Sequence, residues 1–417
     1  MFYGGLLLAM AGFLSFASGG KITTGTTLSI QWFPSDYDPL AVCNDGTRGA
    51  YYFSESISPE MKDTYLIFLP GGGQCFDEAS CQDRWASIGS TYMSSSGFTN
   101  TVDKSGLLDS NPNRSPLWGA NKASLGYCSS DGYMGDAGAS VDTWEWHFRG
   151  QRLVQSMIRH LIEFKGLSGN STVLLAGSSA GARGIMTLAA SLFADHLPKG
   201  SRVALFLDSP YYIDIPPYSP NFQGFPYQEQ QKSQHINTAA IIPSECSEFY
   251  RAASSDAHAS DWKCQFGQYR MPFDSPIPYL LIASQYDAYQ LSGNTQQNPP
   301  YLGPDHDQVT NYGVSFANQT RALLTTLVET AQNPQGKTLA VFSWACYNHA
   351  VAETISFSTL TTETGVTQQD ALKAFLATDP FVVVGAETSK VAQGASNLQW
   401  IDQCNGFACG SGCAARR

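Results

Sequence analysis

Short apolar runs recur along the chain, at residues 64–69, 173–176, 203–207, 277–283 and 339–343. Continuous apolar runs of this length are typical of parallel strands that are buried on both faces. The last three runs are followed by polar residues, and open α/β sheets place their sites at the carboxyl ends of their strands. The pattern therefore predicts a parallel sheet with chemistry along one edge.

The segments between these runs complete the expected architecture. Residues 310–332 and 367–377 are expected to form helices on the flanks of the sheet. Residues 210–234 are rich in Pro, Tyr and Gln and are expected to form an insertion over the site, whereas the polar residues 290–307 are expected to be a loop. Because no linker-like run and no internal repeat divides the chain, we expect a single domain over residues 20–417.

A Gly-x-Ser-x-Gly motif follows the second apolar run and leads into a segment with helical character. A serine on a tight strand-to-helix turn has an exposed hydroxyl with backbone N–H groups close by. Gly177 and Gly181 are expected because the strand and helix backbones approach too closely for side chains. The motif predicts that Ser179 is a nucleophile.

Partners for Ser179 occur in the order Ser, Asp, His, which is the order of an α/β-hydrolase. His349 follows the last apolar run and is the candidate general base. Asp208 and Asp287 both follow apolar runs, and Asp287 is favoured because the acid usually follows the second strand after the nucleophile. Asp208 is then expected to bond loop backbone near Pro210. The fold class expected is therefore α/β-hydrolase-like, with a mostly parallel central sheet flanked by helices, loop insertions and disulfides.

Three consecutive glycines, residues 71–73, directly follow the first apolar run. Glycines leave their backbone N–H groups uncovered and free to face a developing oxyanion. We expect the donors of an oxyanion hole to be the N–H groups of Gly72 and Gly73, together with that of Ala180 at the start of the helix.

The ten cysteines indicate an oxidising compartment. Their spacing gives two close pairs, Cys75/Cys81 and Cys409/Cys413, and one medium pair, Cys246/Cys264. Zinc binding is the alternative, but only the Cys409/Cys413 pair has zinc-like spacing, and no second such pair or histidine pair accompanies it. No metal and no cofactor is therefore expected.

The N-terminus predicts export. Residues 6–16 are apolar and are followed by small residues, which is typical of a signal peptide over residues 1–19. No other segment has the length and apolar character of a stable membrane span. Glycosylation sequons begin at Asn113, Asn170 and Asn318.

The charge balance limits the partners. The chain has 24 basic and 35 acidic residues, a net charge of −11, so nucleic acid is a poor partner. A polyanionic substrate would also be repelled on average unless a local basic patch compensates. This charge argues mildly against a polyanionic substrate, but not against nucleophilic catalysis by Ser179.

The chain resembles the pectin acetylesterase/Notum family of carboxylesterases over roughly residues 28–413. The segments that carry the resemblance are 41–46, 50–52, 69–75 with Cys81, 110–112, 118–121, 127–131, 175–181, 262–267, 285–291, 346–349 and 398–404. The resemblance implies a catalytic triad of Ser179, Asp287 and His349. It also implies the disulfides Cys43–Cys128 and Cys346–Cys404. Gln74 departs from the family, which usually has an aromatic residue in or just after the glycine loop.

These features lead to one main functional hypothesis and two alternatives. We expect a secreted serine carboxylesterase, extracellular and possible in a cell wall, that removes an acetyl group from a polysaccharide such as pectin through an acyl-enzyme. The alternatives are a Notum-like deacylase of a fatty-acylated protein and a non-catalytic secreted binding protein on the same scaffold. The polar amide of Gln74 favours a short acyl group, because it is costly to bury against a long alkyl chain without a partner.

Overall fold

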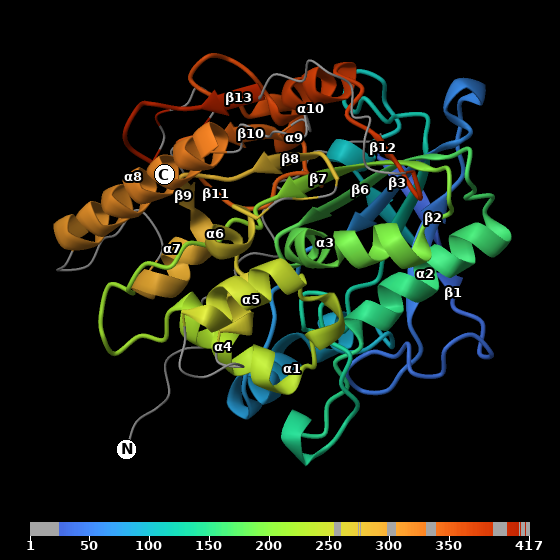
Figure 1. The fold of residues 1–417 in the computed structure, drawn as a ribbon, viewed down its shortest axis with the longest axis horizontal. Coiled ribbons are helices and arrows are strands. Elements are labelled where there is room, and N and C mark those ends of the chain that lie inside the picture. Colours follow the sequence, from blue (N-terminus) through green and yellow to red (C-terminus); the bar gives the residue numbers. More distant parts are fainter. Residues whose placement is uncertain are drawn as a thin grey trace.

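The computed structural model describes residues 25–253, 260–273, 275, 277–297, 306–330, 339–386, 398–407, 409 and 413. The expected signal peptide, residues 1–19, lies outside the described residues. The described part is an α/β structure in which helices cover both faces of a twisted, 11-stranded mixed sheet (Figure 1). The expected fold class is confirmed.

Seven strands form the parallel part of the sheet, and the five apolar runs supply five of them. In spatial order they are β13 (Leu398–Ile401), β10 (Leu339–Ser343), β8 (Tyr279–Ile282), β7 (Arg202–Asp208), β6 (Thr172–Ser178), β3 (Thr64–Leu69) and β5 (Asn121–Leu125). Every residue of β10 and β8 is buried, which explains why the runs are continuous rather than alternating.

The remaining strands are antiparallel or lie off the main ladder. The sheet continues beyond β5 through β2 (Ala50–Ser54), β1 (Thr26–Trp32) and β4 (Thr101–Lys104), and β12 (Val382–Val383) pairs with β7. A separate two-stranded ladder joins β9 (Tyr286–Asp287) to β11 (Tyr347–Asn348). This short ladder holds the segment of Asp287 beside the segment of His349.

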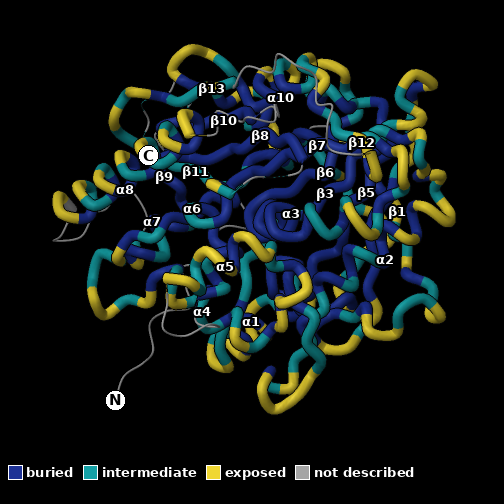
Figure 2. The backbone as a smooth tube through the Cα atoms, viewed as in Figure 1, coloured by how far each residue is buried: buried dark blue, intermediate teal, exposed yellow. Residues whose placement is uncertain are grey.

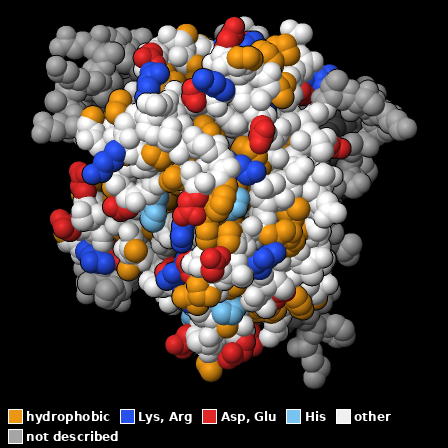
Figure 3. Space-filling model, turned by 90° about the vertical axis from the view of Figure 1, so that its right-hand side faces the viewer, with side chains coloured by type: hydrophobic (Ala, Val, Ile, Leu, Met, Phe, Trp, Pro, Cys, Tyr) orange, Lys and Arg blue, Asp and Glu red, His pale blue; other side chains and the backbone are white. Residues whose placement is uncertain are grey.

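The two faces of the sheet build two apolar cores. One face packs on α2 (Gly150–Phe164), α3 (Ala180–Ser191) and α8 (His306–Thr330). The other packs on α9 (Ser356–Thr359) and α10 (Gln368–Ala377). Figure 2 shows the buried central strands and α3 enclosed by more exposed outer segments. On the face drawn in Figure 3, acidic and basic side chains are interspersed among small apolar groups.

The insertions carry helices of their own. The α-helices not yet named are α1 (Glu78–Tyr92), α4 (Phe225–His235), α5 (Ser244–Ala252), α6 (Gly267–Arg270) and α7 (Ala288–Thr295). The loop expected at residues 290–307 is wrong in its first part, because α7 occupies it. The Asp287 carboxylate caps α7 by accepting a hydrogen bond from the Gln290 N–H at 2.9 Å, and Leu291 is fully buried. The polar composition of this segment predicted a loop, and it gave no sign of the N-terminal cap made by Asp287 or of the buried side chain of Leu291.

All ten cysteines are paired, but two of the expected pairs are wrong. The bridges are Cys43–Cys128, Cys75–Cys81, Cys246–Cys264, Cys346–Cys413 and Cys404–Cys409. Cys346–Cys404 and Cys409–Cys413 do not form, because Arg321 on α8 donates a hydrogen bond to the Cys404 carbonyl at 2.8 Å and keeps that residue on the α8 side. Cys413 instead lies beside the Ala345 carbonyl and is bonded to Cys346.

Candidate active site

Ser179 lies on the turn between β6 and α3 in a strained backbone conformation, with φ 52° and ψ −120°. Its N–H donates to the Asp208 carbonyl at 2.7 Å, which ties the turn to β7. A Cβ on Gly181 would lie 1.9 Å from the Leu69 carbonyl oxygen, and a Cβ on Gly177 would lie 2.6 Å from the Gly181 carbonyl carbon. Both glycines are therefore required by the close approach of β3, β6 and α3.

Ser179, His349 and Asp287 form a continuous hydrogen-bonded chain. The Ser179 Oγ lies 2.7 Å from His349 Nε2, and His349 Nδ1 lies 2.7 Å from Asp287 Oδ2. The ring of Tyr289 stacks on the imidazole with centroids 5.2 Å apart. The three residues come from segments far apart in sequence, and the carboxyl ends of β6, β8 and β10 bring them together.

The environment of His349 makes it a stronger base than an ordinary histidine. Burial acts to lower its pKa, but the charge and the hydrogen bond of Asp287 and the charge of Asp208 outweigh burial and raise the pKa above its usual value. An imidazole held in this way can accept a proton from Ser179 more readily, and the Asp287 carboxylate stabilises the resulting imidazolium.

Asp208 supports the histidine loop rather than the backbone near Pro210. Its Oδ2 accepts from the Ala352 N–H at 2.8 Å, and its Oδ1 accepts from the Ser209 hydroxyl at 3.0 Å. The Ser209 Oγ in turn accepts from the Ala350 N–H at 3.0 Å. Complete burial raises the pKa of Asp208 to about 6.

The glycine loop packs directly on the turn that carries Ser179. A Cβ on Gly71 would lie 2.9 Å from the Ser179 Cβ. The carbonyl of Gly72 accepts from Arg84 Nη2 at 2.6 Å, and the carbonyl of Gly73 accepts from the Tyr127 hydroxyl at 2.6 Å. Within the described part of the chain, the N–H groups of Gly72 and Gly73 donate to no acceptor.

Ala180 supplies a third N–H close to the loop. It is the first residue of α3, so its N–H lies outside the intrahelical hydrogen bonds. The arrangement thus offers backbone donors beside Ser179, with the carbonyls of the loop tied back by Arg84 and Tyr127.

Gln74, the residue after the glycine loop, is held by charged side chains. Its Oε1 accepts from Arg183 Nη1 at 2.9 Å and from Lys232 Nζ at 3.1 Å, while its Nε2 donates to Glu229 at 3.3 Å. Sequence reasoning missed these three charged residues. The signals available were an arginine four residues after Ser179 in an apolar helix, and Glu229 and Lys232 three residues apart in the insertion.

An aromatic cluster contacts His349 through the ring of Tyr289. Tyr212, Phe225 and Tyr289 lie with ring centroids 5.3 to 6.0 Å apart. Tyr212 and Phe225 are almost fully buried, at 3% and 5% exposure, and pack with Trp262 and Phe266. Through Tyr289, which stacks on the imidazole, this cluster of packed rings is in contact with His349.

Comparison with known proteins identifies the family. The family model described as Pectinacetylesterase matches residues 23–412. The chain belongs to the pectinacetylesterase family.

Curated relatives in this family include enzymes named for two different substrates. The palmitoleoyl-protein carboxylesterase NOTUM of Mus musculus is 30% identical over 267 residues, which are 60% of this chain and 49% of that protein. The pectin acetylesterase 5 of Arabidopsis thaliana is 28% identical over 324 residues, covering 74% of this chain and 70% of that protein. The chain thus spans about half the length of the NOTUM relatives it matches.

The fold is that of a solved relative. The crystal structure of the Wnt deacylase Notum from Drosophila superposes with a TM-score of 0.75 at 23% identity, covering 93% of this chain and 99% of that one. This likeness supports the α/β fold described above.

Other features expected from sequence lie away from Ser179. Asn113, Asn170 and Asn318 are all exposed, and Asn318 lies within α8. Among the described residues, no group of three or more His, Cys, Asp or Glu could hold a metal ion. No helix in the described ranges combines the length and apolar character needed to cross a bilayer.

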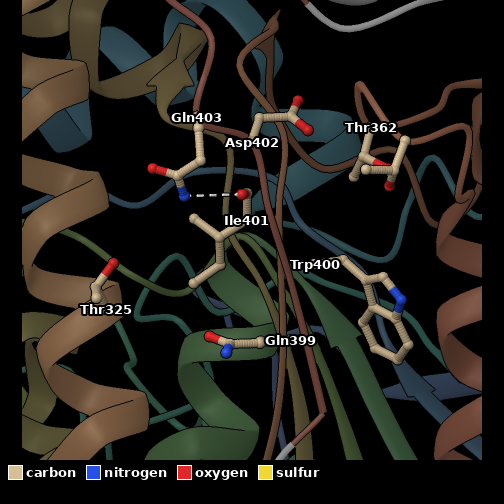
Figure 4. A pocket seen from close by; sticks show the side chains of 8 residues that line it. Thr325, Thr362, Gln399, Trp400, Ile401, Asp402 and Gln403 are labelled. Atoms are coloured by element: carbon tan, nitrogen blue, oxygen red, sulfur yellow. Dashed lines mark hydrogen bonds between the residues drawn. The ribbon is translucent and has the colours of Figure 1, made fainter.

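One cavity lies at the β13 edge of the sheet, remote in the sheet order from β6. It has a volume of about 370 Å³ and is lined by Thr325, Thr362, Thr364 and residues 399–403. Figure 4 shows Trp400 and Ile401 on opposite sides of the strand, with Thr325 contributed by the neighbouring helix. None of its lining residues belongs to the Ser179 site.

Proposed function

We propose that this protein is a serine carboxylesterase that acts through an acyl-enzyme, with Ser179 as nucleophile, His349 as base and Asp287 as acid. The observation that carries the proposal is the hydrogen-bonded chain of these three side chains, at 2.7 Å for each step, beside the N–H groups of the glycine loop. His349 takes the Ser179 proton as Oγ attacks the ester carbonyl. The N–H groups of Gly72, Gly73 and Ala180 donate to the oxyanion.

The reaction then divides into two steps of similar chemistry. The collapse of the first tetrahedral intermediate expels the alcohol, which receives a proton from His349. Water, activated by His349, attacks the acyl-enzyme and releases the carboxylic acid. Asp287 keeps the imidazole oriented and stabilises its charged form in both steps.

We infer that the acyl group is short, and that acetyl on a polysaccharide is the main substrate class. The support is the close-packed aromatic cluster beside His349 and the buried ionic groups around Gln74, against which a long alkyl chain would be costly to bury. The relative named pectin acetylesterase 5 is consistent with this class. The net charge of −11 favours a weakly charged acetylated glycan over a highly anionic pectin.

The alternative is a deacylase of a fatty-acylated protein, which the names of the NOTUM relatives support. The two functions make opposite predictions about chain length. Each methylene buried in a lipid pocket contributes about 0.8 kcal/mol, so a lipid deacylase should gain kcat/KM from acetate to octanoate. For an enzyme specific for short acyl groups, kcat/KM should fall from acetate to octanoate.

The deciding experiment compares hydrolysis of p-nitrophenyl acetate, butyrate and octanoate, followed by acetate release from acetylated pectin and an acetylated neutral polysaccharide. We expect acetate or butyrate to be preferred and octanoate to be poor. A steady rise through octanoate would assign the protein to the lipid-deacylase function. If a folded protein hydrolysed no ester at all, the binding-protein alternative would stand instead.

We also propose that the protein is extracellular, as one domain over residues 20–417 after removal of residues 1–19. The support is five disulfides in a chain whose cysteines are all paired. Expression in a eukaryotic secretory host, followed by N-terminal sequencing and removal of N-glycans, tests this point. A retained N-terminus and an unchanged mass would contradict the leader and the use of Asn113, Asn170 and Asn318.

A further inference from the structure

Three charged side chains form a buried ion network next to the glycine loop. It consists of Arg183 on α3 and of Glu229 and Lys232 on α4, whose side chains are only 2%, 1% and 0% exposed. Arg183 pairs with Glu229, and Lys232 Nζ lies 2.5 Å from Glu229 Oε1. Arg183 also contacts the Tyr212 ring, 4.7 Å from its centroid, and donates to the Gln265 carbonyl.

The charges of this buried ion network do not cancel. It holds two cations and one anion, and Arg84, another buried cation, lies on the other side of the glycine loop. Burying charge is unfavourable, and well-packed apolar residues would serve stability as well or better. Asp131, a fully buried carboxylate, also faces Lys232, so the net charge of the region does not by itself explain these groups. Both cations of the network contact Gln74 beside the loop where negative charge develops, and this position is better explained by the reaction than by folding.

The buried ion network is linked directly to the oxyanion donors. Gln74 follows Gly73, and its Oε1 accepts from both Arg183 and Lys232, at 2.9 and 3.1 Å. On the other side, Arg84 holds the Gly72 carbonyl at 2.6 Å. Arg183 lies four residues after Ser179 on the same helix that presents the Ala180 N–H. The glycine loop is thus held between cations on both sides.

We propose that the buried ion network is a positioning device for the oxyanion hole, and that the positive charge of Lys232 raises kcat. This inference rests on the proposed function. Lys232 acts through Gln74, which fixes the loop, and through its charge, which favours the transition state over the neutral ester. Fixed charges in a water-excluded site stabilise a developing oxyanion more than the same charges in water.

Lys232 gives the device a dependence on pH. Burial lowers the pKa of Lys232 to about 8, and the facing groups are Glu229 on the same helix, Arg183 on α3 and Asp131. Burial opposes the charges of Arg183 and Glu229, but their mutual attraction keeps the pKa of Arg183 above and that of Glu229 below the usual values. As pH rises through about 8, Lys232 alone loses its charge, and kcat should fall to a lower plateau.

The test is the pH profile of kcat for p-nitrophenyl acetate in three variants. Lys232→Met removes the charge in a similar volume, Lys232→Arg retains it at every accessible pH, and Lys373→Met is a control at a half-exposed position on α10. We expect Lys232→Met to lower kcat at pH 7 by on the order of tenfold, with KM little changed and no basic limb. Lys232→Arg should recover most of that loss and also lack the limb, whereas Lys373→Met should match the wild type.

Each of three results would refute this role of Lys232. One is a folded Lys232→Met that keeps a basic limb near pH 8, which would point to Lys122, another buried lysine whose pKa is lowered to about 8 by burial. Another is a raised KM at unchanged kcat. If Lys232→Met does not fold, a folded Lys232→Arg that keeps the wild-type limb is sufficient to refute the role.

The proposed function is tested separately in the same assay. Activity retained by a folded Ser179→Ala would overturn the esterase mechanism itself. An inactive Ser179→Ala together with unaltered Lys232 variants would overturn only the role of the buried ion network.

Discussion

At the scale of single residues, the two buried carboxylates near His349, Asp287 and Asp208, have different roles. Asp287 contacts the imidazole at 2.7 Å, whereas Asp208 holds the loop that follows it through the Ala352 N–H and Ser209. The sequence predicted these two roles only from the order of the strands. Both aspartates follow apolar runs, and Asp287 was favoured because it follows the second strand after the one that leads to Ser179. The contacts of Asp208 could not be predicted, since they depend on how the loop after His349 folds back over β7.

Replacing Asp287 by Asn should be far more damaging than replacing Asp208 by Asn. The amide introduced by Asp287→Asn would present N–H groups to Nδ1 and force the wrong imidazole tautomer, so kcat should fall by on the order of a thousandfold or more. Asp208→Asn can still accept from the Ala352 N–H, and we expect a loss of about tenfold or less. Steady-state kinetics of both variants decide the matter, and a reversed ranking would make Asp208 the acid.

The pH dependence of kcat/KM should show an acid limb set by His349. Only the neutral imidazole accepts the Ser179 proton, so activity should be lost as pH falls through the raised pKa, above its usual 6.5. Because the charge of Asp208 contributes to that rise, Asp208→Asn should move the limb to lower pH. A limb that stays in place in this variant would contradict the contribution of Asp208.

At the scale of elements, five of the seven parallel strands could be predicted, whereas β5, β13 and the helices of the insertions could not. Uninterrupted apolar runs identify strands with few alternatives, and the Gly-x-Ser-x-Gly turn identifies the start of α3. By contrast, α7 begins with a cap made by Asp287, and beyond its first residue, Phe225, α4 packs through the charged side chains of Glu229 and Lys232. Neither helix has the hydrophobic periodicity on which sequence-based prediction depends.

The junction of β3, β6 and α3 should tolerate no side chain at Gly181. The added methyl group of Gly181→Ala would overlap the Leu69 carbonyl oxygen, and both backbones are fixed by the sheet. We expect a loss of unfolding free energy of about 3 kcal/mol or more, together with lost activity. Gly224→Ala, whose Cβ would meet only proline ring atoms at 3.3 Å or more, is the matched control for thermal denaturation.

A nearly unchanged melting temperature of Gly181→Ala would contradict the close approach. The same result would show that the Ser179 turn can shift away from the glycine loop without loss of the fold.

At the scale of the whole molecule, the disulfides join segments that the sheet alone leaves loose. Cys346–Cys413 spans 67 residues and ties the segment after β13 to the loop of His349, whereas Cys404–Cys409 closes a separation of only 5. Spacing alone favoured the neighbours Cys409 and Cys413. The true partners depend on the course of the chain after β13, which no local pattern reveals.

Removing the long bridge should be more destabilising than removing the short one. Chain-entropy arguments give about 4 kcal/mol for loss of Cys346–Cys413 and about 2 kcal/mol for Cys404–Cys409. Paired Cys→Ser variants compared by denaturant unfolding measure this difference, and mapping of unreduced peptides tests the pairing directly. Peptides joined through Cys346 and Cys404 would contradict the connectivity, and free thiols in the denatured, unreduced protein would contradict complete pairing.

The Asp287 carboxylate makes two different contacts, and these limit which substitutions the site can accept. One carboxylate oxygen begins α7 through the Gln290 N–H, and the other orients His349. Asp287→Glu, conservative in charge, would displace both oxygens by a methylene and disturb a helix terminus together with a base. Substitutions of Asp287 therefore also change the geometry of α7. Replacing Asp287 by another acidic residue would require a second substitution that restores the N-terminal cap of that helix.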